Sequence, residues 1–231
     1  MALIKSPVDA GPLALLLSST VRHDGNGGVA DDLADPTGLA DWLVAAAEPL
    51  ARAGFALDPP GPLDPQVAPA DRATLDRVLA VRAALRALLA RAVSPAPPSP
   101  ADAHRLIPAG QAVARLNAAA AAEPVVPRLD WPTDGAPVAG LVAAAPAGGP
   151  AATATALVAV LARAAIDFLA GPDLPRLRAC TAPRCVRYFL KEHGRQEFCK
   201  ASCGNRARAA RHYQRHNHPG PAPEDAPGRR P

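Results

Sequence analysis

Residues 176–218, RLRACTAPRCVRYFLKEHGRQEFCKASCGNRARAARHYQRHNH, hold all four cysteines of this chain. The spacing is C-x4-C-x13-C-x3-C, which is two close pairs separated by a short span. Two such pairs can fold over one another and present four thiolates to one point, the closed tetrahedral arrangement that structural zinc prefers. We therefore predict one structural Zn²⁺ in this stretch, bound by Cys180, Cys185, Cys199 and Cys203.

The residues around the cysteines predict a β-hairpin followed by a helix. Pro183 lies between the first two cysteines, where the chain must turn. Residues 186–190 are typical of a short strand, and we expect residues 196–198 to return as its partner after a turn at 193–195. A helix then begins near Cys203 and runs to about His216. A helix N-terminus favours the thiolate form of a cysteine, as do the neighbouring Lys200 and Arg206.

Other uses of the cysteines fit less well. Two disulfides would require an exported protein, and we see no secretory signal in the sequence. A catalytic zinc keeps one coordination position open for water, which four cysteines do not leave, so we expect no enzymatic activity. His212 and His216 have the spacing of a helical metal pair, but the cysteines already complete a site. We interpret both histidines as surface residues.

Charge is distributed unevenly along the chain. Residues 176–218 contain eleven Lys or Arg and two Glu, whereas residues 1–175 contain twelve Lys or Arg and seventeen Asp or Glu. A basic module on an acidic body is typical of a protein whose module meets a polyanion.

The C-terminal helix has a predicted basic face. At about 100° per residue, four of its side chains share roughly one third of the circumference. The opposite side carries Ala209, Ala210 and Tyr213, which we expect to pack on the hairpin. Arginine forks suit phosphates and guanine edges, so we predict double-stranded DNA as the partner. A zinc-stabilised protein–protein or RNA-binding adaptor is the alternative. The predicted DNA contacts are Arg208, Arg211, His212 and Arg215, extended by Arg187 and Lys191.

The run Cys203-Gly204-Asn205-Arg206 resembles the signature of the CGNR zinc finger, and Arg178 and Phe189 are similar to the rest of that motif. We expect Gly204, Asn205 and Arg206 to support the metal ligands structurally, because they follow the last ligand directly. The resemblance implies an ABATE-type N-terminal domain, in a family regarded as stress-induced transcription regulators. It also implies that the N-terminal domain senses an unknown small molecule or stress signal.

The rest of the chain predicts a mostly helical domain. Asp35-Pro36 starts a helix that we expect to run to about Ala53, with a possible kink at Pro49. Asp71 caps a long helix, Asp102 begins a third one that is interrupted at Pro108, and residues 151–170 form a fourth. Residues 125–144 read as a β-hairpin with a turn near Asp134. We interpret the arginines of the long helix as a solvated face; they are Arg72, Arg77, Arg82, Arg86 and Arg91.

The predicted fold class is mainly α with a small β-hairpin (α+β). The domains are a helical, ABATE-like one over residues 1–172, a four-cysteine zinc finger of hairpin and helix over 173–218, and a disordered tail over 219–231. The most apolar helix contains Arg163 and Asp167, and no run approaches the roughly 18 apolar residues of a membrane span. We therefore expect a cytoplasmic protein without a membrane segment.

Overall fold

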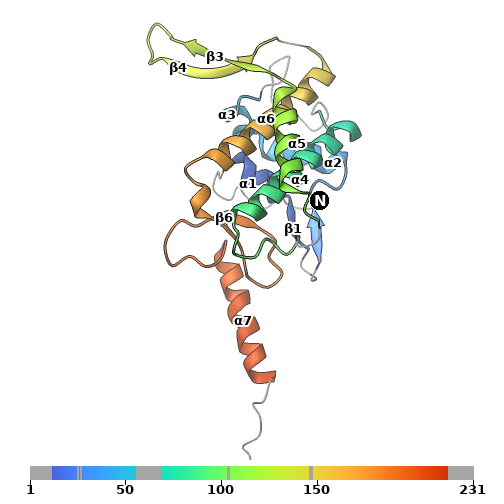
Figure 1. The fold of residues 1–231 in the computed structure, drawn as a ribbon, viewed down its shortest axis with the longest axis vertical. Coiled ribbons are helices and arrows are strands. Elements are labelled where there is room, and N and C mark those ends of the chain that lie inside the picture. Colours follow the sequence, from blue (N-terminus) through green and yellow to red (C-terminus); the bar gives the residue numbers. More distant parts are fainter. Residues whose placement is uncertain are drawn as a thin grey trace, which may run out of the picture.

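The structure is a computed structural model that describes residues 12–24, 26, 28–55, 69–102, 105–145 and 148–217. These residues form seven α-helices, one 3-10 turn and three two-stranded sheets. A helical body lies in the middle, a β-hairpin projects from one end and the last helix projects from the other (Figure 1). The predicted fold class is confirmed. The predicted tail at 219–231 lies outside the described residues.

The core of the body consists of three long helices and one short one. Helices α4 (Arg72–Ala92), α5 (Ala109–Ala121) and α6 (Pro150–Ala170) pack on one another, and α1 (Leu13–Ser18) packs on α4 and α6. Asp71 caps α4 as predicted, because its side chain accepts a hydrogen bond of 2.7 Å from the Thr74 N–H. Aromatic residues are scarce, so leucines such as Leu85 and Leu157 fill the core, at about 2 kcal/mol for each fully buried side chain.

Pro49 divides the second predicted helix more sharply than a kink would. Asp35 caps α2 (Pro36–Ala45) through the Gly38 N–H at 2.9 Å, as its position before proline predicts. The chain then leaves the helical conformation at Ala46, and α3 (Ala47–Arg52) begins a new helix. Proline cannot donate to the carbonyl four residues before it, and its ring crowds that carbonyl. The helix therefore breaks one turn ahead of Pro49.

Helix α6 belongs to this core. It is the one helix of the described chain that is long and apolar enough to cross a membrane, by length and composition alone. Half of its apolar window is buried inside the body, where it packs on α1, α4 and α5. Arg163 on this helix donates to the Glu123 carbonyl at 2.9 Å and to its carboxylate at 2.8 Å. Its apolar character is that of a core helix.

The predicted third helix begins later than expected. Asp102 does not cap a helix; α5 begins at Ala109, directly after Pro108. The residue before a proline disfavours the helical conformation, so Ile107 separates the two segments. Asp102 turns inward instead and is buried against α4.

Two further hairpins flank the body. Strands β3 (Val125–Asp130) and β4 (Val138–Ala143) form the hairpin predicted at 125–144. Strands β1 (Val21–His23) and β2 (Val29–Asp31) form a second hairpin, which was not predicted from the sequence. The Asp24 carboxylate holds that turn, accepting from the N–H groups of Asn26 at 2.7 Å and Gly28 at 2.9 Å.

The interpretation of the α4 arginines as a solvated face is wrong for two of the five. Arg82 is buried and makes a two-pronged contact of 2.6 Å per bond with the Asp31 carboxylate, and it also donates to Thr20 at 2.8 Å. Burial alone would raise the pKa of Asp31, but the hydrogen bonds and charge of Arg82 hold it below its usual value. Arg86 is the second buried arginine, and its partners connect the body with the metal centre.

Candidate metal centre

The first two cysteines lie at the turn of a small hairpin. Strand β5 (Leu177–Ala179) pairs antiparallel with β6 (Tyr188–Leu190), and the Cys180 N–H donates to the Arg187 carbonyl at 2.9 Å. The predicted pairing of residues 186–190 with 196–198 is therefore wrong. Residues 196–198 form no strand, and the Gln196 side chain accepts from the Glu192 N–H at 2.7 Å. Short apolar runs do not specify their partner, and the buried Leu177 favours the strand that lies against the body.

A tight turn brings the first two sulfur atoms together. The Cys185 N–H donates to the Ala182 carbonyl at 3.0 Å, Pro183 follows Ala182, and Arg184 has a φ of 64°. A proline at the second position and a positive φ at the third are those of a type II turn. Arg184 holds a conformation that only glycine adopts freely, because this turn points both sulfur atoms to the same side.

The second pair is presented by the start of a helix. Cys199 precedes α7 (Ala201–Asn217), and Cys203 is the third residue of that helix. The Cys203 N–H donates to the Lys200 carbonyl at 3.0 Å, which closes the first turn. Cys203 thus lies in the first turn of α7, close to the helix start that the sequence predicted.

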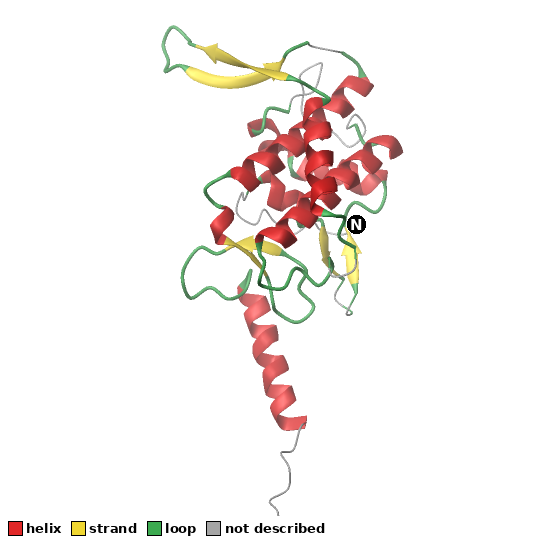
Figure 2. Cartoon of the chain, viewed as in Figure 1, coloured by secondary structure: helices red, strands yellow, loops and turns green. Residues whose placement is uncertain are grey.

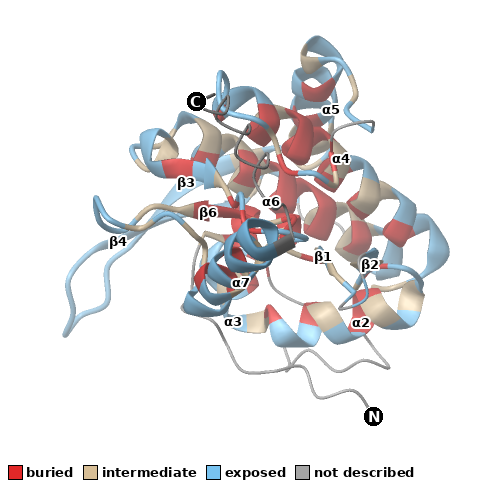
Figure 3. Ribbon diagram, turned by 90° about the horizontal axis from the view of Figure 1, so that it is seen from below, coloured by how far each residue is buried: buried red, intermediate tan, exposed pale blue. Residues whose placement is uncertain are grey.

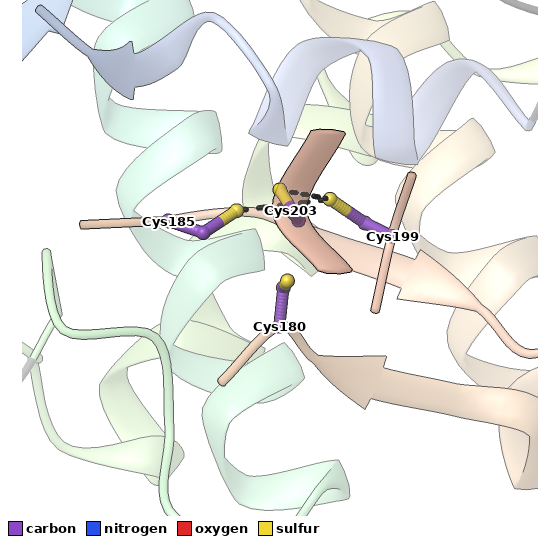
Figure 4. A group of neighbouring side chains, drawn as sticks. All are labelled: Cys180, Cys185, Cys199 and Cys203. Atoms are coloured by element: carbon purple, nitrogen blue, oxygen red, sulfur yellow. Dashed lines mark hydrogen bonds between the residues drawn. The ribbon is translucent and has the colours of Figure 1, made fainter. Parts of the chain in front are cut away.

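The four sulfur atoms converge on one point (Figure 4). All of them lie within 4.8 Å of one another, with 3.7 Å between Cys185 and Cys199 and 3.5 Å between Cys199 and Cys203. A tetrahedral zinc with Zn–S bonds of about 2.3 Å places its sulfur ligands about 3.8 Å apart. A disulfide would need a separation of about 2.05 Å. The four cysteines therefore form a site for one structural Zn²⁺.

The electrostatics of the cluster require a cation. Cys180, Cys185 and Cys203 are buried, and Phe189 and Phe198 pack around them. Hydrogen bonds from Cys185 and Cys199 lower the pKa of Cys180, whereas the contact with Cys180 raises the pKa of Cys185 to about 11. Contacts with Cys180 and Cys185 raise the pKa of Cys199. By themselves, Cys185 and Cys199 do not ionise near neutral pH. A bound divalent ion stabilises four thiolates together.

Positive side chains surround this site. A zinc ion with four thiolates carries a net charge of −2, and Arg206 donates to the Cys203 sulfur at 3.1 Å. Arg187 and Lys200 line a cavity of about 440 Å³ that also reaches Cys185 and Cys203. Arg22 lines it too, but it pairs with the Asp32 carboxylate at 2.5 Å. These cations offset the charge of the metal centre.

The other two residues of the expected support do not touch the sulfur atoms. The exposed Asn205 accepts a hydrogen bond from Arg208, one turn further along α7. Gly204 is buried, but an added Cβ would lie 3.5 Å from Phe198, which is an ordinary contact. Among Gly204, Asn205 and Arg206, only Arg206 orients a ligand directly.

Most of α7 lies outside the finger's core. Ala207 is its last buried residue, and the helix projects away from the body (Figure 1). Figure 3 shows α7 as mostly exposed. The expected packing of Ala209 and Tyr213 on the hairpin is wrong, because Ala209 is exposed and Tyr213 is 69% exposed. The hairpin turned out to lie against the body, where it cannot cover the later turns of the helix.

The structure places the predicted DNA-contacting residues in two groups. Arg208, Arg211, His212 and Arg215 lie together along one side of α7. Arg187 lies apart from them, in the cavity beside the metal centre. Lys191 follows the other end of β6, where its N–H donates to the Arg176 carbonyl at 2.8 Å.

A buried polar network attaches the first half of the finger to the body. Arg86 on α4 donates to the Asp102 carboxylate at 2.7 and 3.0 Å and to the Ser18 carbonyl at 2.6 Å. The side chains of Arg86 and Asp102 are only 6% and 7% exposed. Tyr188 on β6 donates to the same carboxylate at 2.7 Å, and its ring lies 5.4 Å from the Arg86 guanidinium carbon.

The same network reaches the residue next to a metal ligand. The Ser99 hydroxyl donates to the Val186 carbonyl at 2.8 Å, and Arg86 reaches that carbonyl at 3.3 Å. Val186 directly follows Cys185. This connection was not predicted from the sequence, although a signal was present: Val78, Arg82 and Arg86 follow one another at four-residue spacing on the buried stripe of α4.

These features define a class of protein, a helical body whose terminal four-cysteine zinc finger ends in a basic helix. Residues 11–172 match the family model of ABATE, described as "Putative stress-induced transcription regulator", and residues 176–216 match that of the CGNR zinc finger. The first match covers more than half of the chain, so the chain belongs to the ABATE family and carries a CGNR zinc finger. A search among curated proteins gave no match.

Proposed function

We propose that this protein binds double-stranded DNA through α7 and regulates transcription. The observation that carries the proposal is the exposed basic side of that helix. Arg208, Arg211 and Arg215 are exposed, and no carboxylate of the described residues pairs with them. Arg208 donates to the Asn205 side chain and Arg215 to the Arg211 carbonyl, but neither contact neutralises an arginine charge. Arginines without a carboxylate partner are available to phosphates.

The dimensions of the projecting segment suit a DNA groove. An α-helix with its side chains is about 10–12 Å across, and the major groove is about 12 Å wide, so the groove admits one helix. Residues 208–216 offer about 13 Å of helix length to such a groove. The spacing of three and four residues sets the arginines in one row. The metal centre holds the start of α7, so the row has a fixed base. Phosphate contacts would supply most of the affinity, and an arginine that reaches guanine would add sequence preference.

The experiment that tests the proposal measures binding of the full, zinc-loaded chain to duplex DNA selected from a random pool, across a salt series. Changing Arg208, Arg211 and Arg215 together to alanine should weaken binding strongly while zinc content and helicity stay unchanged. Each phosphate contact that is lost should lower the salt slope by about one. A residue that reads guanine should cost about 1–3 kcal/mol at one base pair.

A matched control separates the helix from overall charge. Arg91, Arg105 and Arg115 are exposed arginines of the body, so their triple alanine variant loses the same charge elsewhere. It should bind DNA like the parent protein. If the α7 variant binds as tightly as the parent, the proposal fails and an adaptor for protein or RNA becomes the better reading.

The same proposal assigns signal sensing to the N-terminal domain and places the protein in the cytoplasm. A cavity of about 540 Å³ between α1, α3 and the end of α6 is lined by Phe168 and the charged Arg52 and Asp167, a size that suits a small molecule. Metal-bound thiolates favour a reducing compartment. We assign the chain no catalytic role, since four thiolates saturate the metal. Thermal-shift screening of small metabolites, with Ala164→Trp filling the cavity, tests the sensing part.

A further inference from the structure

The hairpin β3–β4 carries an unusual amount of exposed apolar surface. Only its ends, Val125 and Ala143, are half-buried, and every strand residue between them is exposed. Figures 1 and 2 show the hairpin projecting from the body at the end opposite α7. Among the described residues, six of the eleven large hydrophobic ones that are exposed lie on it, with exposed fractions between 36% and 68%. They are Val126, Leu129, Trp131, Val138, Leu141 and Val142.

The strand register separates the two faces of this hairpin. Directly opposed residues share a face, so Val126 with Val142 and Asp130 with Val138 belong to one side, which also carries Arg128. The other side is formed by Val125, Pro127, Leu129, Ala139, Leu141 and Ala143, all of which are apolar. Trp131, 68% exposed, follows the strand end. One face is therefore mixed, and the other is wholly apolar.

A two-stranded hairpin is at best marginally stable in water, and monomeric proteins seldom expose apolar patches beyond a few hundred Å². We propose that the apolar face of β3–β4 is a self-association surface that packs on the same face of a second copy of this chain. This face is formed by Val125, Pro127, Leu129, Ala139, Leu141 and Ala143.

Charge and size select the second copy as the occupant. The face has no charged residue, and the Arg128 and Asp130 of the opposite face cancel, so nothing attracts a polyanion or a basic partner. An apolar face is complementary to another apolar face, and a two-fold axis places the same face of a second copy against the first. Leu129, Leu141 and Trp131, at roughly 100–150 Å² each, give about 600–900 Å² of buried surface for two copies. The exposed Pro127 and Ala139 bring this total toward about 1,000 Å², where specific interfaces begin.

Packing of the apolar faces of two copies would bury these exposed residues better than hydrogen-bonded pairing of their strand edges. Pro127 lies opposite Leu141 and has no N–H to donate, so the outer edge of β3 lacks a donor at its centre. Edge pairing along β4 would also leave Leu129 and Leu141 in water. The backbone groups of Ala139 face the outer edge of β4, as those of Leu141 do. Opposed pairs alternate between hydrogen-bonded and non-hydrogen-bonded types, and these two residues, two positions apart, belong to the same type.

The experiment is sedimentation velocity of the full, zinc-loaded chain over a wide concentration range. The parent should form dimers reversibly. Leu129→Lys and Leu141→Lys, at 64% and 58% exposure, should each raise the dimer dissociation constant about tenfold or more. Val126→Lys and Val138→Lys are matched controls, because they add the same charge to the same strands at 45% and 60% exposure, but on the mixed face. They should leave the constant within a few-fold of the parent's value.

Three outcomes would overturn the inference. The parent could be a monomer at every concentration. The mixed-face variants could dissociate the dimer as strongly as the apolar-face variants, which would mean that charge alone is responsible. Ala139→Pro, which removes one outward N–H from β4, could abolish the dimer while the apolar-face variants keep it, which would indicate edge pairing. DNA binding by the dissociated variants is measured separately, so this inference and the proposed function fail independently.

Discussion

The two halves of the zinc finger differ in what holds them. The β5–β6 hairpin with Cys180 and Cys185 lies against the body, and Leu177 and Tyr188 are part of the body's own core. The half with Cys199 and Cys203 leads into α7, which Figure 3 shows as mostly exposed. Between Ala207 and His216 only Ala210 is half-buried, and the other residues are exposed. Four sulfur atoms, two from each half, join an anchored element to a projecting one. The metal centre thus acts as a joint between the body and the basic helix rather than as the core of an independent module.

The largest effect is expected from removing a ligand of the projecting half. Cys203→Ser should release zinc and unfold residues 196–217, because zinc binding supplies about 10–16 kcal/mol in small modules of this kind. The β5–β6 hairpin should stay attached to the body. Metal analysis and hydrogen exchange measure both effects, with Ser202→Ala as the neighbouring control. Loss of exchange protection throughout α4 and α6 would show that the halves are not separable.

Breaking the buried ion pair should affect the anchored half. Arg86→Met leaves the Asp102 carboxylate buried without its charged partner, which should cost about 3–5 kcal/mol of unfolding free energy. Chemical denaturation measures this cost. Arg91→Met removes an exposed arginine from the same helix and should change stability little. Equal losses for both variants would contradict the role of the network.

Removing the arginine beside the sulfur should weaken the projecting half more mildly. Arg206→Ala deletes the 3.1 Å hydrogen bond to Cys203, and a bond to a charged group contributes about 1.5–3 kcal/mol. Zinc should be lost to a competing chelator more readily, and the melting temperature should fall. Arg211→Ala, on the exposed side of the same helix, should retain zinc like the parent. An Arg206→Ala protein with parental zinc retention that has lost only DNA binding would place Arg206 in the contact surface instead.

The smallest effect concerns the phenol of the anchored half. Tyr188→Phe removes two hydrogen bonds, the one that the hydroxyl donates to Asp102 and the one that it accepts from the Ser99 N–H at 3.3 Å. Because Arg86 still pairs with Asp102, the loss should cost about 1–2 kcal/mol. Burial, and after it the hydrogen bond to Asp102, raises the pKa of Tyr188 above its usual value of 10.0. The folded state thus keeps the proton to higher pH than the unfolded chain. The stability from this group is fully present below about pH 10 and is lost as the pH rises through the folded pKa.

Stability measured on both sides of pH 10 tests this dependence. The parent should lose more stability above pH 10 than Tyr188→Phe does, while Tyr213→Phe should follow the parent, because Tyr213 is 69% exposed. Identical alkaline profiles for all three proteins would contradict the buried, hydrogen-bonded phenol.

The sequence by itself determined the features that neighbouring residues encode. The spacing of four cysteines predicted the metal site, and Asp35 and Asp71 predicted two helix starts, because a capping side chain reaches only the next turn. The hairpin at 125–144 followed from a turn signal between two apolar runs. Each of these depends on contacts over a few residues, or on a ligand set that zinc chemistry restricts.

Only the tertiary structure decided which distant segments meet. It chose Leu177–Ala179 as the partner of β6, it buried Arg86 with Asp102 and Tyr188, and it left Tyr213 in solvent. A buried arginine and an exposed one have the same local sequence pattern. What distinguishes them is whether packing supplies polar partners that offset the loss of water. At Arg86, these partners are the Asp102 carboxylate, 16 residues further along the chain, and the Val186 carbonyl, 100 residues further along.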